Sequence, residues 1–377
     1  MSRLFLHFYP MLFQLILFSI TVHCGRQEEH LRPPVTPHLT DQFSHLSFKE
    51  GYSVVWGGPT NVQQLNGGNL VKLILDKSSG SGFISQDDFY YGFFSAAIKL
   101  PENYSAGIVV AFYTSNSDVF PRTHDELDFE FLGHARRKQW VLQTNVYGNG
   151  SVHTGREERF HLWFDPAAEF HEYSILWNYN HTVFFVDNIP IREIQHIKEW
   201  GVQYPSKPMS VYSTIWDGSD WATEGGRYPV DYRYAPFVAS YTNLELDGCV
   251  WNPTQPTPLC SYRPQSTNPI DGPEFKSLDA TQRAGMDWVR KRFMTYSYCQ
   301  DSSRYPIAPP ECQGQRKSKT GPGQNTEYNN DLGTFEQEEP PTMTRFSKYG
   351  RMKFSVPPSQ RMPGVGTGMD RRAYGLW

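Results

Sequence analysis

Residues 124–133 read HDELDFEFLG, and the alternation in this stretch predicts a β-strand with two chemically different faces. Side chains of a strand point alternately to opposite sides, so Glu126, Asp128 and Glu130 share one face. The other face can pack on a hydrophobic core, because it carries Leu127, Phe129 and Phe131. Three neighbouring carboxylates on one face repel one another and cost stability unless they have a use. The stretch therefore predicts a functional site on the outside of an apolar core.

Short strands of this kind recur between about residue 46 and residue 246. Runs of aromatic and β-branched residues alternate there with turn residues, at 88–100, 108–113, 172–178, 182–186 and 211–216. Residues 174–177 and 183–186 flank a short polar turn and predict a hairpin. The composition agrees, because 15% aromatic residues, 30 Gly and 28 Pro in 377 residues do not suit a helical bundle. We therefore expect an all-β protein of the jelly-roll or sandwich class.

The N-terminus and the sequons suggest the secretory route. Residues 1–25 have the features of a signal peptide, with Arg3 ahead of an apolar stretch over residues 4–22. A membrane anchor is the alternative, although the unbroken apolar part is short for a bilayer span. Three Asn-x-Ser/Thr sequons, which are candidate glycosylation sites, fit secretion: Asn103, Asn149 and Asn180. The formal net charge of −4 is too mild to suggest nucleic acid as a partner.

The cysteines predict disulfide bonds near the C-terminus. Of five cysteines, Cys24 would leave with the signal peptide, and four remain. Four thiols in a secreted chain predict two disulfides, with three possible connectivities. Short loops close at the least entropic cost, which favours the pairs Cys249–Cys260 and Cys299–Cys312.

The region between and after these cysteines differs from the strand-rich part. Met286, Val289, Phe293 and Tyr296 are spaced like one face of a helix. We expect this helix to belong to a small disulfide-stapled extension. Residues 313–377 carry ten Lys or Arg against six Asp or Glu, with much Gly, Pro and Ser. This composition predicts a disordered basic tail.

The three carboxylates suit glycoside hydrolysis, which needs one ionised and one protonated carboxyl group beside the scissile bond. A central Asp128 can share a hydrogen bond with one glutamate, and crowding raises the pKa of the carboxyl that must stay protonated. A cation site is the alternative, since carboxylates at positions i, i+2 and i+4 are suitable oxygen ligands. The twelve histidines show no metal-ligand spacing and no phosphate-binding loop follows a strand. We therefore expect no metal and no cofactor.

Residues 124–133 resemble the signature of plant xyloglucan endotransglucosylase/hydrolases, which are members of glycoside hydrolase family 16. Further matches follow in chain order: LDKSSGSGF at 75–83, QTNV at 143–146, LWFDP at 162–166, IWDGSDWAT at 215–223 and APF at 235–237. The resemblance covers about residues 35–312. It implies a jelly-roll β-sandwich with a substrate cleft on its concave face, acting on xyloglucan in the plant cell wall.

The resemblance also implies roles for single residues. Glu126 falls at the position of the nucleophile, Glu130 at that of the acid/base, and Asp128 at that of the assisting carboxylate. The implied substrate-binding residues are Gln143, Thr144, Asn145, Arg156, Glu157, Asp220, Trp221, Gly225 and Arg304. Amides suit the recognition of hydroxyl groups, and an exposed Trp221 beside a buried Trp216 would provide a ring for stacking on a sugar. Arg304 as a local ion-pair partner remains the alternative for that residue. The chain departs from the family at Gly155, where an Asp is usual.

We expect four parts: a signal peptide at 1–25, a catalytic domain at 26–247, an extension at 248–312 and the tail at 313–377. The expected activity is that of a xyloglucan:xyloglucosyl transferase, which cuts a β-1,4-glucan backbone with retention and rejoins it to another xyloglucan chain. A xyloglucan or β-glucan hydrolase is the alternative, but the loop at 225–234 is of ordinary length, whereas hydrolases of the family have a longer one. A non-catalytic lectin is a further alternative, which the intact carboxylate triad disfavours. Donor and acceptor xyloglucan chains are the expected partners of a monomer in the apoplast, with weak pectin contact through the tail and no nucleic acid or membrane partner.

Overall fold

The computed structural model describes residues 33–135, 139–150, 155–252, 254, 270 and 272–312. The expected signal peptide, Cys260, Ser151 of one sequon and the basic tail lie outside the described residues. Within the described part of the chain, no helix combines the length and the apolar character needed to cross a membrane.

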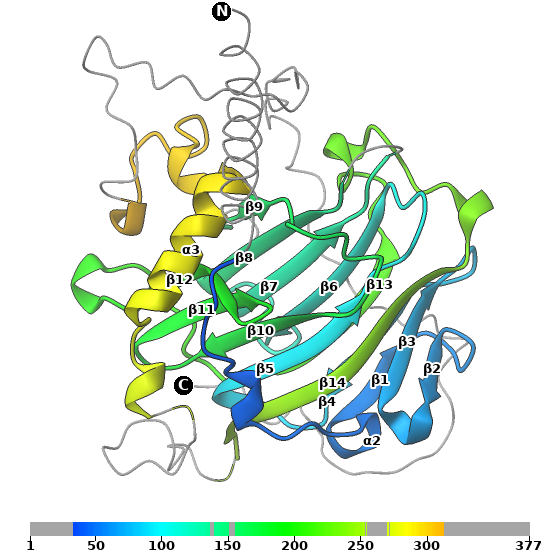
Figure 1. The fold of residues 1–377 in the computed structure, drawn as a ribbon, viewed down its shortest axis with the longest axis horizontal. Helices are drawn as coiled ribbons and strands as arrows, with labels where there is room; N and C mark the ends of the chain where they lie inside the picture. Colours follow the sequence, from blue (N-terminus) through cyan, green and yellow to red (C-terminus); the bar gives the residue numbers. More distant parts are fainter. Residues whose placement is uncertain are drawn as a thin grey trace, which may run out of the picture. The chain divides into compact units, whose positions relative to one another are not determined.

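Two antiparallel sheets form the protein, as expected for an all-β sandwich (Figure 1). The first sheet has eight strands. In spatial order they are β1 (Tyr52–Trp56), β4 (Ser81–Ser85), β13 (Ser210–Asp217), β6 (Ile108–Ser115), β7 (His124–Leu132), β8 (Val141–Gly150), β9 (Glu158–Phe160) and β15 (Met294–Ser297). The predicted acidic strand, β7, thus lies inside this sheet, between β6 and β8.

The second sheet has seven strands. In spatial order they are β12 (Ile189–Gln195), β11 (His181–Val186), β10 (His171–Trp177), β5 (Phe89–Lys99), β14 (Phe237–Val250), β3 (Leu70–Leu75) and β2 (Val62–Leu65). Strands β10 and β11 form the predicted hairpin, in which Trp177 faces Thr182 beside the turn.

Helices are few. The α-helices are α2 (Phe48–Gly51) and α3 (Ala280–Arg292). Short 3₁₀ turns complete the connections: η1 (Thr40–Gln42), η2 (Asn66–Gly68), η4 (Lys198–Trp200), η5 (Glu224–Gly226), η6 (Tyr232–Tyr234), η8 (Pro273–Phe275), η9 (Tyr298–Gln300) and η10 (Pro310–Cys312).

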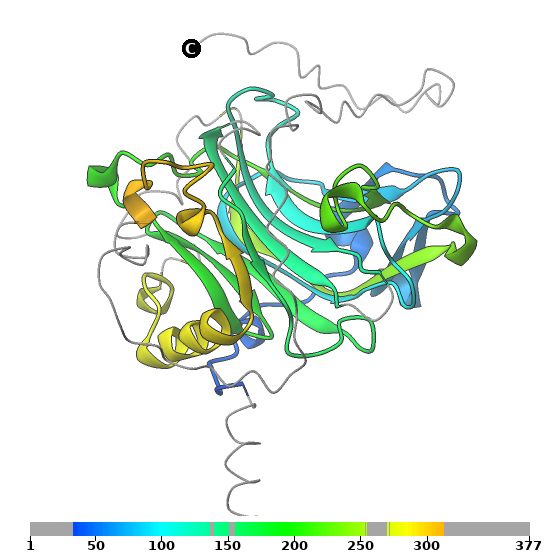
Figure 2. The ribbon, with the colours of Figure 1, turned by 90° about the horizontal axis from the view of Figure 1, so that it is seen from above.

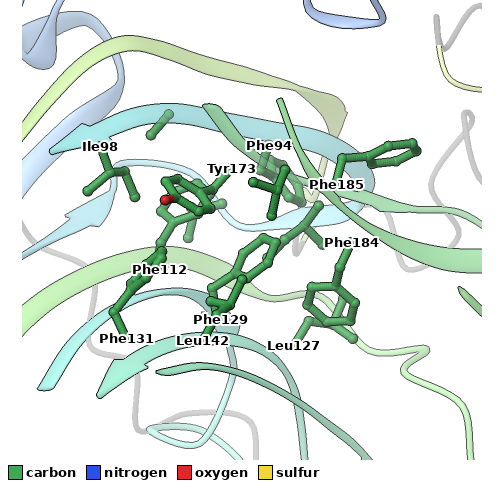
Figure 3. Packing of buried hydrophobic residues seen from close by; sticks show 14 of the residues in the cluster. Phe94, Ile98, Phe112, Leu127, Phe129, Phe131, Leu142, Tyr173, Phe184 and Phe185 are labelled. Atoms are coloured by element: carbon green, nitrogen blue, oxygen red, sulfur yellow. The ribbon is translucent and has the colours of Figure 1, made fainter. Parts of the chain in front are cut away.

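The core lies between the two sheets and is rich in aromatic rings (Figure 3). Leu127, Phe129 and Phe131 of β7 have no exposed surface, which confirms the apolar face predicted for this strand. The ring of Phe131 packs edge-on against Tyr173 of β10, with 4.7 Å between centroids. Phe129 packs in the same manner on Phe184 of β11, at 5.1 Å. Because one face of β7 is fixed in this core, the face with the carboxylates must point away from it.

The predicted C-terminal helix exists but is shorter than its apolar spacing suggested. Asp279 caps α3: its side chain accepts a hydrogen bond from Gln282 N, and the Gln282 side-chain oxygen accepts one from Asp279 N. The helix ends at Arg292, and Phe293 is its C-cap. Tyr296 was wrongly placed on the helix, because Met294–Ser297 instead form β15, which pairs with β9. The extension therefore adds a strand to the eight-stranded sheet (Figure 2).

The disulfides agree with local pairing as far as they are described. Cys299 is bonded to Cys312, as predicted from the short loop between them. Cys249 is also disulfide-bonded, and its partner is neither of these two. Its expected partner, Cys260, lies outside the described residues.

Candidate active site

Glu126, Asp128 and Glu130 lie on the outer side of the eight-stranded sheet, which we call the carboxylate face. Facing residues from β13, β6, β7 and β8 form three rows across it. The rows are Ser210, Ser115, Glu126 and Tyr147; Tyr212, Tyr113, Asp128 and Asn145; and Thr214, Ala111, Glu130 and Gln143. Each carboxylate is therefore flanked by a different pair of neighbours, which can give chemically similar groups different properties.

Glu126 is held by a hydroxyl group. Ser115 Oγ donates to Glu126 Oε2 over 2.6 Å. His124 Nε2 lies 4.0 Å from the same oxygen, and 21% of the Glu126 side chain is exposed. Burial raises the pKa of Glu126 to about 7, the hydrogen bond from Ser115 opposes this rise, and the charge of Glu130 adds to it.

Glu130 is held by an amide group. Gln143 Nε2 donates to Glu130 Oε2, and Arg159 Nε donates to Gln143 Oε1 over 2.8 Å. The arginine selects the orientation of the amide, because only the oxygen of Gln143 can accept its proton. Burial raises the pKa of Glu130 to about 7, while the bond from Gln143 opposes the rise and the charge of Glu157 adds to it. The side chain of Gln143 thus touches a catalytic candidate directly.

Asp128 lies between the two glutamates and is only 6% exposed. Burial raises its pKa well above the usual range, and the charges of Glu126 and Glu130 raise it further. A hydrogen bond with Asp128 favours the ionised form of Glu126. Three carboxyl groups this close, of which Asp128 is buried, do not all ionise together. The arrangement favours a protonated Asp128 that donates to an ionised Glu126, with Glu130 free to keep a proton.

On β8, the structure separates the three expected binding residues. Asn145 lies on the carboxylate face, and its Oδ1 accepts hydrogen bonds from the backbone N–H groups of Val146 and Arg156. Thr144 has no exposed surface and faces the opposite way, where Arg192 donates to its Oγ1 over 2.9 Å. The expectation that Thr144 contacts substrate does not fit this position, because adjacent strand residues alternate faces.

The segment after Gly155 holds the extension in place. Arg156 is 7% exposed and donates to the backbone oxygens of Val146 and Gln203, so its side chain serves the packing of these segments. Glu157 and Arg304 form an ion pair, in which Arg304 Nη2 lies 3.2 Å from Glu157 Oε1. This contact is the ion-pair alternative considered for Arg304, and it joins the extension to the edge of the carboxylate face.

The loop after β13 carries the remaining expected residues. Trp221 is half-buried, packs near Leu132 at the end of β7, and lies 6.0 Å from Trp216 between ring centroids. Trp216 is half-buried as well, so the expected contrast between an exposed and a buried ring is wrong. Asp220 is exposed, and Gly225 is exposed with a φ of +68° that favours glycine. These three residues lie beyond the Glu130 end of β7.

Several residues of the site escape a reading of the sequence. Ser115 and Arg159 touch the triad or its partner, and Tyr113 stacks on Tyr212 at 5.1 Å beside Asp128. Tyr113 and Ser115 alternate as polar residues at the end of β6, and this alternation is the signal in the sequence that could have indicated these two residues. In the part of the chain that the structure describes, no group of three or more His, Cys, Asp or Glu side chains is arranged to hold a metal ion.

Two family models match this two-sheet protein with its acidic strand. Residues 48–234 match the family model of glycosyl hydrolases family 16, and residues 264–312 match that of the xyloglucan endo-transglycosylase C-terminus. A solved Bacillus licheniformis β-glucanase is 24% identical and has a TM-score of 0.43, over 52% of this chain and 91% of that one.

Two curated plant relatives are more similar. Probable xyloglucan endotransglucosylase/hydrolase protein 27 of Arabidopsis thaliana is 52% identical over 71% of this chain and 78% of its own length. Xyloglucan endotransglucosylase protein 34 of Populus tremula x Populus tremuloides is 41% identical over 80% and 97%. The chain belongs to the xyloglucan endotransglucosylase/hydrolases of glycosyl hydrolases family 16.

Proposed function

We propose that this protein is a retaining xyloglucan endotransglucosylase that remodels the plant cell wall. The observation that carries the proposal is the triad on β7, in which Glu126 and Glu130 have different hydrogen-bond donors and Asp128 lies between them. This asymmetry suits a reaction that needs one ionised and one protonated carboxyl group. The names of the plant relatives support xyloglucan as the substrate.

The proposed reaction has two steps. In the first, the Glu126 carboxylate attacks the anomeric carbon, while Glu130 gives its proton to the oxygen of the leaving chain. The glycosidic bond breaks and a glycosyl ester on Glu126 forms. In the second step, Glu130 takes the proton of an acceptor hydroxyl, whose oxygen attacks the anomeric carbon and releases the Glu126 carboxylate. The product keeps the configuration of the donor, because each step inverts it once.

Transfer exceeds hydrolysis only if an acceptor sugar is held where water would otherwise react. We assign acceptor binding to Trp221 and Asp220, which lie beyond the Glu130 end of β7, and to Gln143 and Asn145 on β8. The ion pair of Glu157 with Arg304, a residue of the extension, forms part of the border of this acceptor region. The half-buried ring of Trp221 can stack on a pyranose. Gly225 fits as a turn residue beside this ring, and Arg156 supports Asn145 through its backbone.

Further proposals concern the parts of the chain, its secretion and its retention in the cell wall. We assign residues 1–25 to a signal peptide, 26–247 to the catalytic domain, 248–312 to the extension and 313–377 to the tail. Secretion would allow glycosylation at exposed Asn103, Asn149 and Asn180. The basic tail would attract pectin weakly in a salt-dependent manner. Truncation after residue 315 should leave turnover unchanged and reduce pectin binding at low salt, and equal binding would refute this role.

The deciding assay mixes xyloglucan polymer with labelled xyloglucan oligosaccharide and follows label in polymer together with new reducing ends. A transferase incorporates label with few new reducing ends. Reducing ends that rise without incorporation would identify the hydrolase alternative, and binding without either product would identify a lectin. Glu126→Gln should reduce transfer by a factor on the order of 10⁴ or more, because an amide cannot form the ester. Full turnover by this variant would contradict the proposed mechanism.

Two companion variants separate the remaining roles. Glu130→Gln should fail on natural donors, and azide should restore part of the activity with donors whose leaving group needs no proton. Asp128→Asn should cost less activity than either glutamate variant, because Asp128 assists Glu126 and forms no bond to the sugar.

A further inference from the structure

Ser115 is buried, with 2% of its surface exposed, and it ends β6 directly opposite Glu126 of β7. Its Oγ lies 2.6 Å from Glu126 Oε2. Ser115 Oγ also accepts a hydrogen bond from Ser117 N over 3.1 Å. A hydroxyl group has one proton to give, and this second contact occupies an acceptor position of the oxygen. The proton of Ser115 is therefore directed at the carboxylate of Glu126.

The position of Ser115 relative to Glu126 is fixed by the next residue. Asn116 is 3% exposed, and its Oδ1 accepts from Asp125 N over 2.8 Å, while its Nδ2 donates to Pro208 O over 2.9 Å. Asp125 is fully buried and accepts from the backbone N–H groups of Ser206 and Lys207. The end of β6 is thus fastened to β7 and to the loop that precedes β13, so that the hydroxyl is preorganised.

We propose that Ser115 is a positioning residue for Glu126, which keeps this carboxylate ionised and presents its second oxygen to the sugar. The inference rests on the proposed function, because it assigns Ser115 to the nucleophile of that reaction. A bond from Ser115 to Oε2 leaves Oε1 to attack the anomeric carbon. Once the ester has formed, Oε2 is the carbonyl oxygen of a neutral group and a weaker acceptor.

The same bond should assist the second step. When the acceptor oxygen displaces Glu126, negative charge returns to the carboxylate as the ester bond breaks. The Ser115 proton stabilises this developing charge without moving, which is the property of a preorganised donor. Removal of the hydroxyl should therefore have two effects, namely protonation of Glu126 at a higher pH and slower release of the glycosyl group.

The test uses Ser115→Ala in the full mature chain and a 2-fluoro xyloglucan-oligosaccharyl fluoride as the probe. This reagent forms the ester on Glu126, and its fluoride leaves without a proton from Glu130. The pH dependence of labelling therefore reports the ionisation of Glu126 in the presence of Asp128 and Glu130, which all variants keep. The midpoint of labelling should move up by about one pH unit, since a hydrogen bond to a charged group is worth at least that shift. Ser115→Thr, which keeps the hydroxyl, should restore the midpoint.

Ser210→Ala is the matched control. Ser210 is 4% exposed, faces Ser115 on the neighbouring strand, and donates to Asp88 rather than to the triad. Its loss should leave the midpoint in place. If Ser115→Ala does not fold, Ser115→Cys makes the same comparison, because a thiol fills the site but is only a weak donor.

Three results would overturn the proposal. An unchanged midpoint in Ser115→Ala would remove the role in ionisation, and an equal shift in Ser210→Ala would show a general effect of losing a buried hydroxyl. Failure of the wild-type protein to be labelled on Glu126 would instead refute the proposed function itself, on which this inference depends. Labelling of the wild type together with a shifted midpoint in Ser115→Ala alone would support it.

Discussion

Replacing Glu245 by glutamine is expected to stabilise the protein at neutral pH and to change little at acid pH. Glu245 lies on β14 with 1% of its surface exposed. His45 Nε2 approaches its Oε1 to 3.0 Å, but neither carboxylate oxygen has a hydrogen bond of good geometry among the described residues. Burial, with smaller contributions from the charges of Glu172, Asp247 and Asp41, raises the pKa of Glu245 to about 8.

The magnitude follows from the two pKa values of this group. In the unfolded chain the carboxyl titrates near 4.5, and in the folded protein near 8. The folded form therefore holds a proton that the unfolded form releases between these values, and stability falls as the pH rises through this window. One pH unit corresponds to 1.36 kcal/mol, so the loss at pH 7 is about 3 kcal/mol relative to pH 4.5. A neutral glutamine does not titrate and avoids this loss.

Urea unfolding of wild type and Glu245→Gln at pH 4.5 and pH 7, with the disulfides intact, measures the effect. The variant should match the wild type at pH 4.5 and exceed it by about 3 kcal/mol at pH 7. Glu169→Gln is the control, because the Glu169 side chain is 78% exposed and the same substitution there should change neither value. An equal difference at both pH values, or a less stable variant at pH 7, would refute the reasoning.

The remaining predictions concern the attachment of the extension and the acid. Arg290→Met removes a bidentate partner of Glu158, a residue 3% exposed, and should cost about 3–5 kcal/mol in urea unfolding; an unchanged midpoint would contradict it. The positive charge of Arg159 lowers the pKa of Glu130, so Arg159→Met should raise this pKa and move the basic limb of the kcat/KM profile to higher pH. An unmoved limb would show that Arg159 does not act on the ionisation of Glu130. Loss of the Cys299–Cys312 bond by Cys312→Ser should destabilise by about 2–4 kcal/mol, seen as a lower Tm, and an equal Tm would argue against a stabilising role.

The strands and the acidic face were predictable because their signals are local. The alternation in β7 fixes which residues face the core, and Phe129 and Phe131 are buried as that pattern requires. The β10–β11 hairpin follows equally from two apolar runs and a polar turn. Such patterns depend on side-chain periodicity, which the sequence states directly.

The partners of the carboxylates were not predictable, because they depend on register between strands. Ser115 faces Glu126 because of the register of β6 on β7, which the hydrogen bond between Asp125 N and Asn116 Oδ1 supports at the strand end. Likewise, a shift of one residue on β8 would exchange the places of Gln143 and Thr144. The family resemblance supplied a contiguous binding run there, but strand geometry allows only alternate members of such a run to reach one face.

The extension completes the surroundings of the acid, although none of its described residues forms a hydrogen bond or ion pair with Glu130. Gln143, Arg159 and Tyr296 face one another across β8, β9 and β15, in the same row as Glu130. The Arg159 guanidinium lies 5.3 Å from the centre of the Tyr296 ring, and its Nε fixes the orientation of the amide that donates to Glu130. Without β15, the strand β9 would be an edge with unpaired backbone groups, and Arg159 would lose this ring. The extension thus continues the sheet that carries the triad. Its Tyr296 packs on Arg159, which orients Gln143, the donor to Glu130.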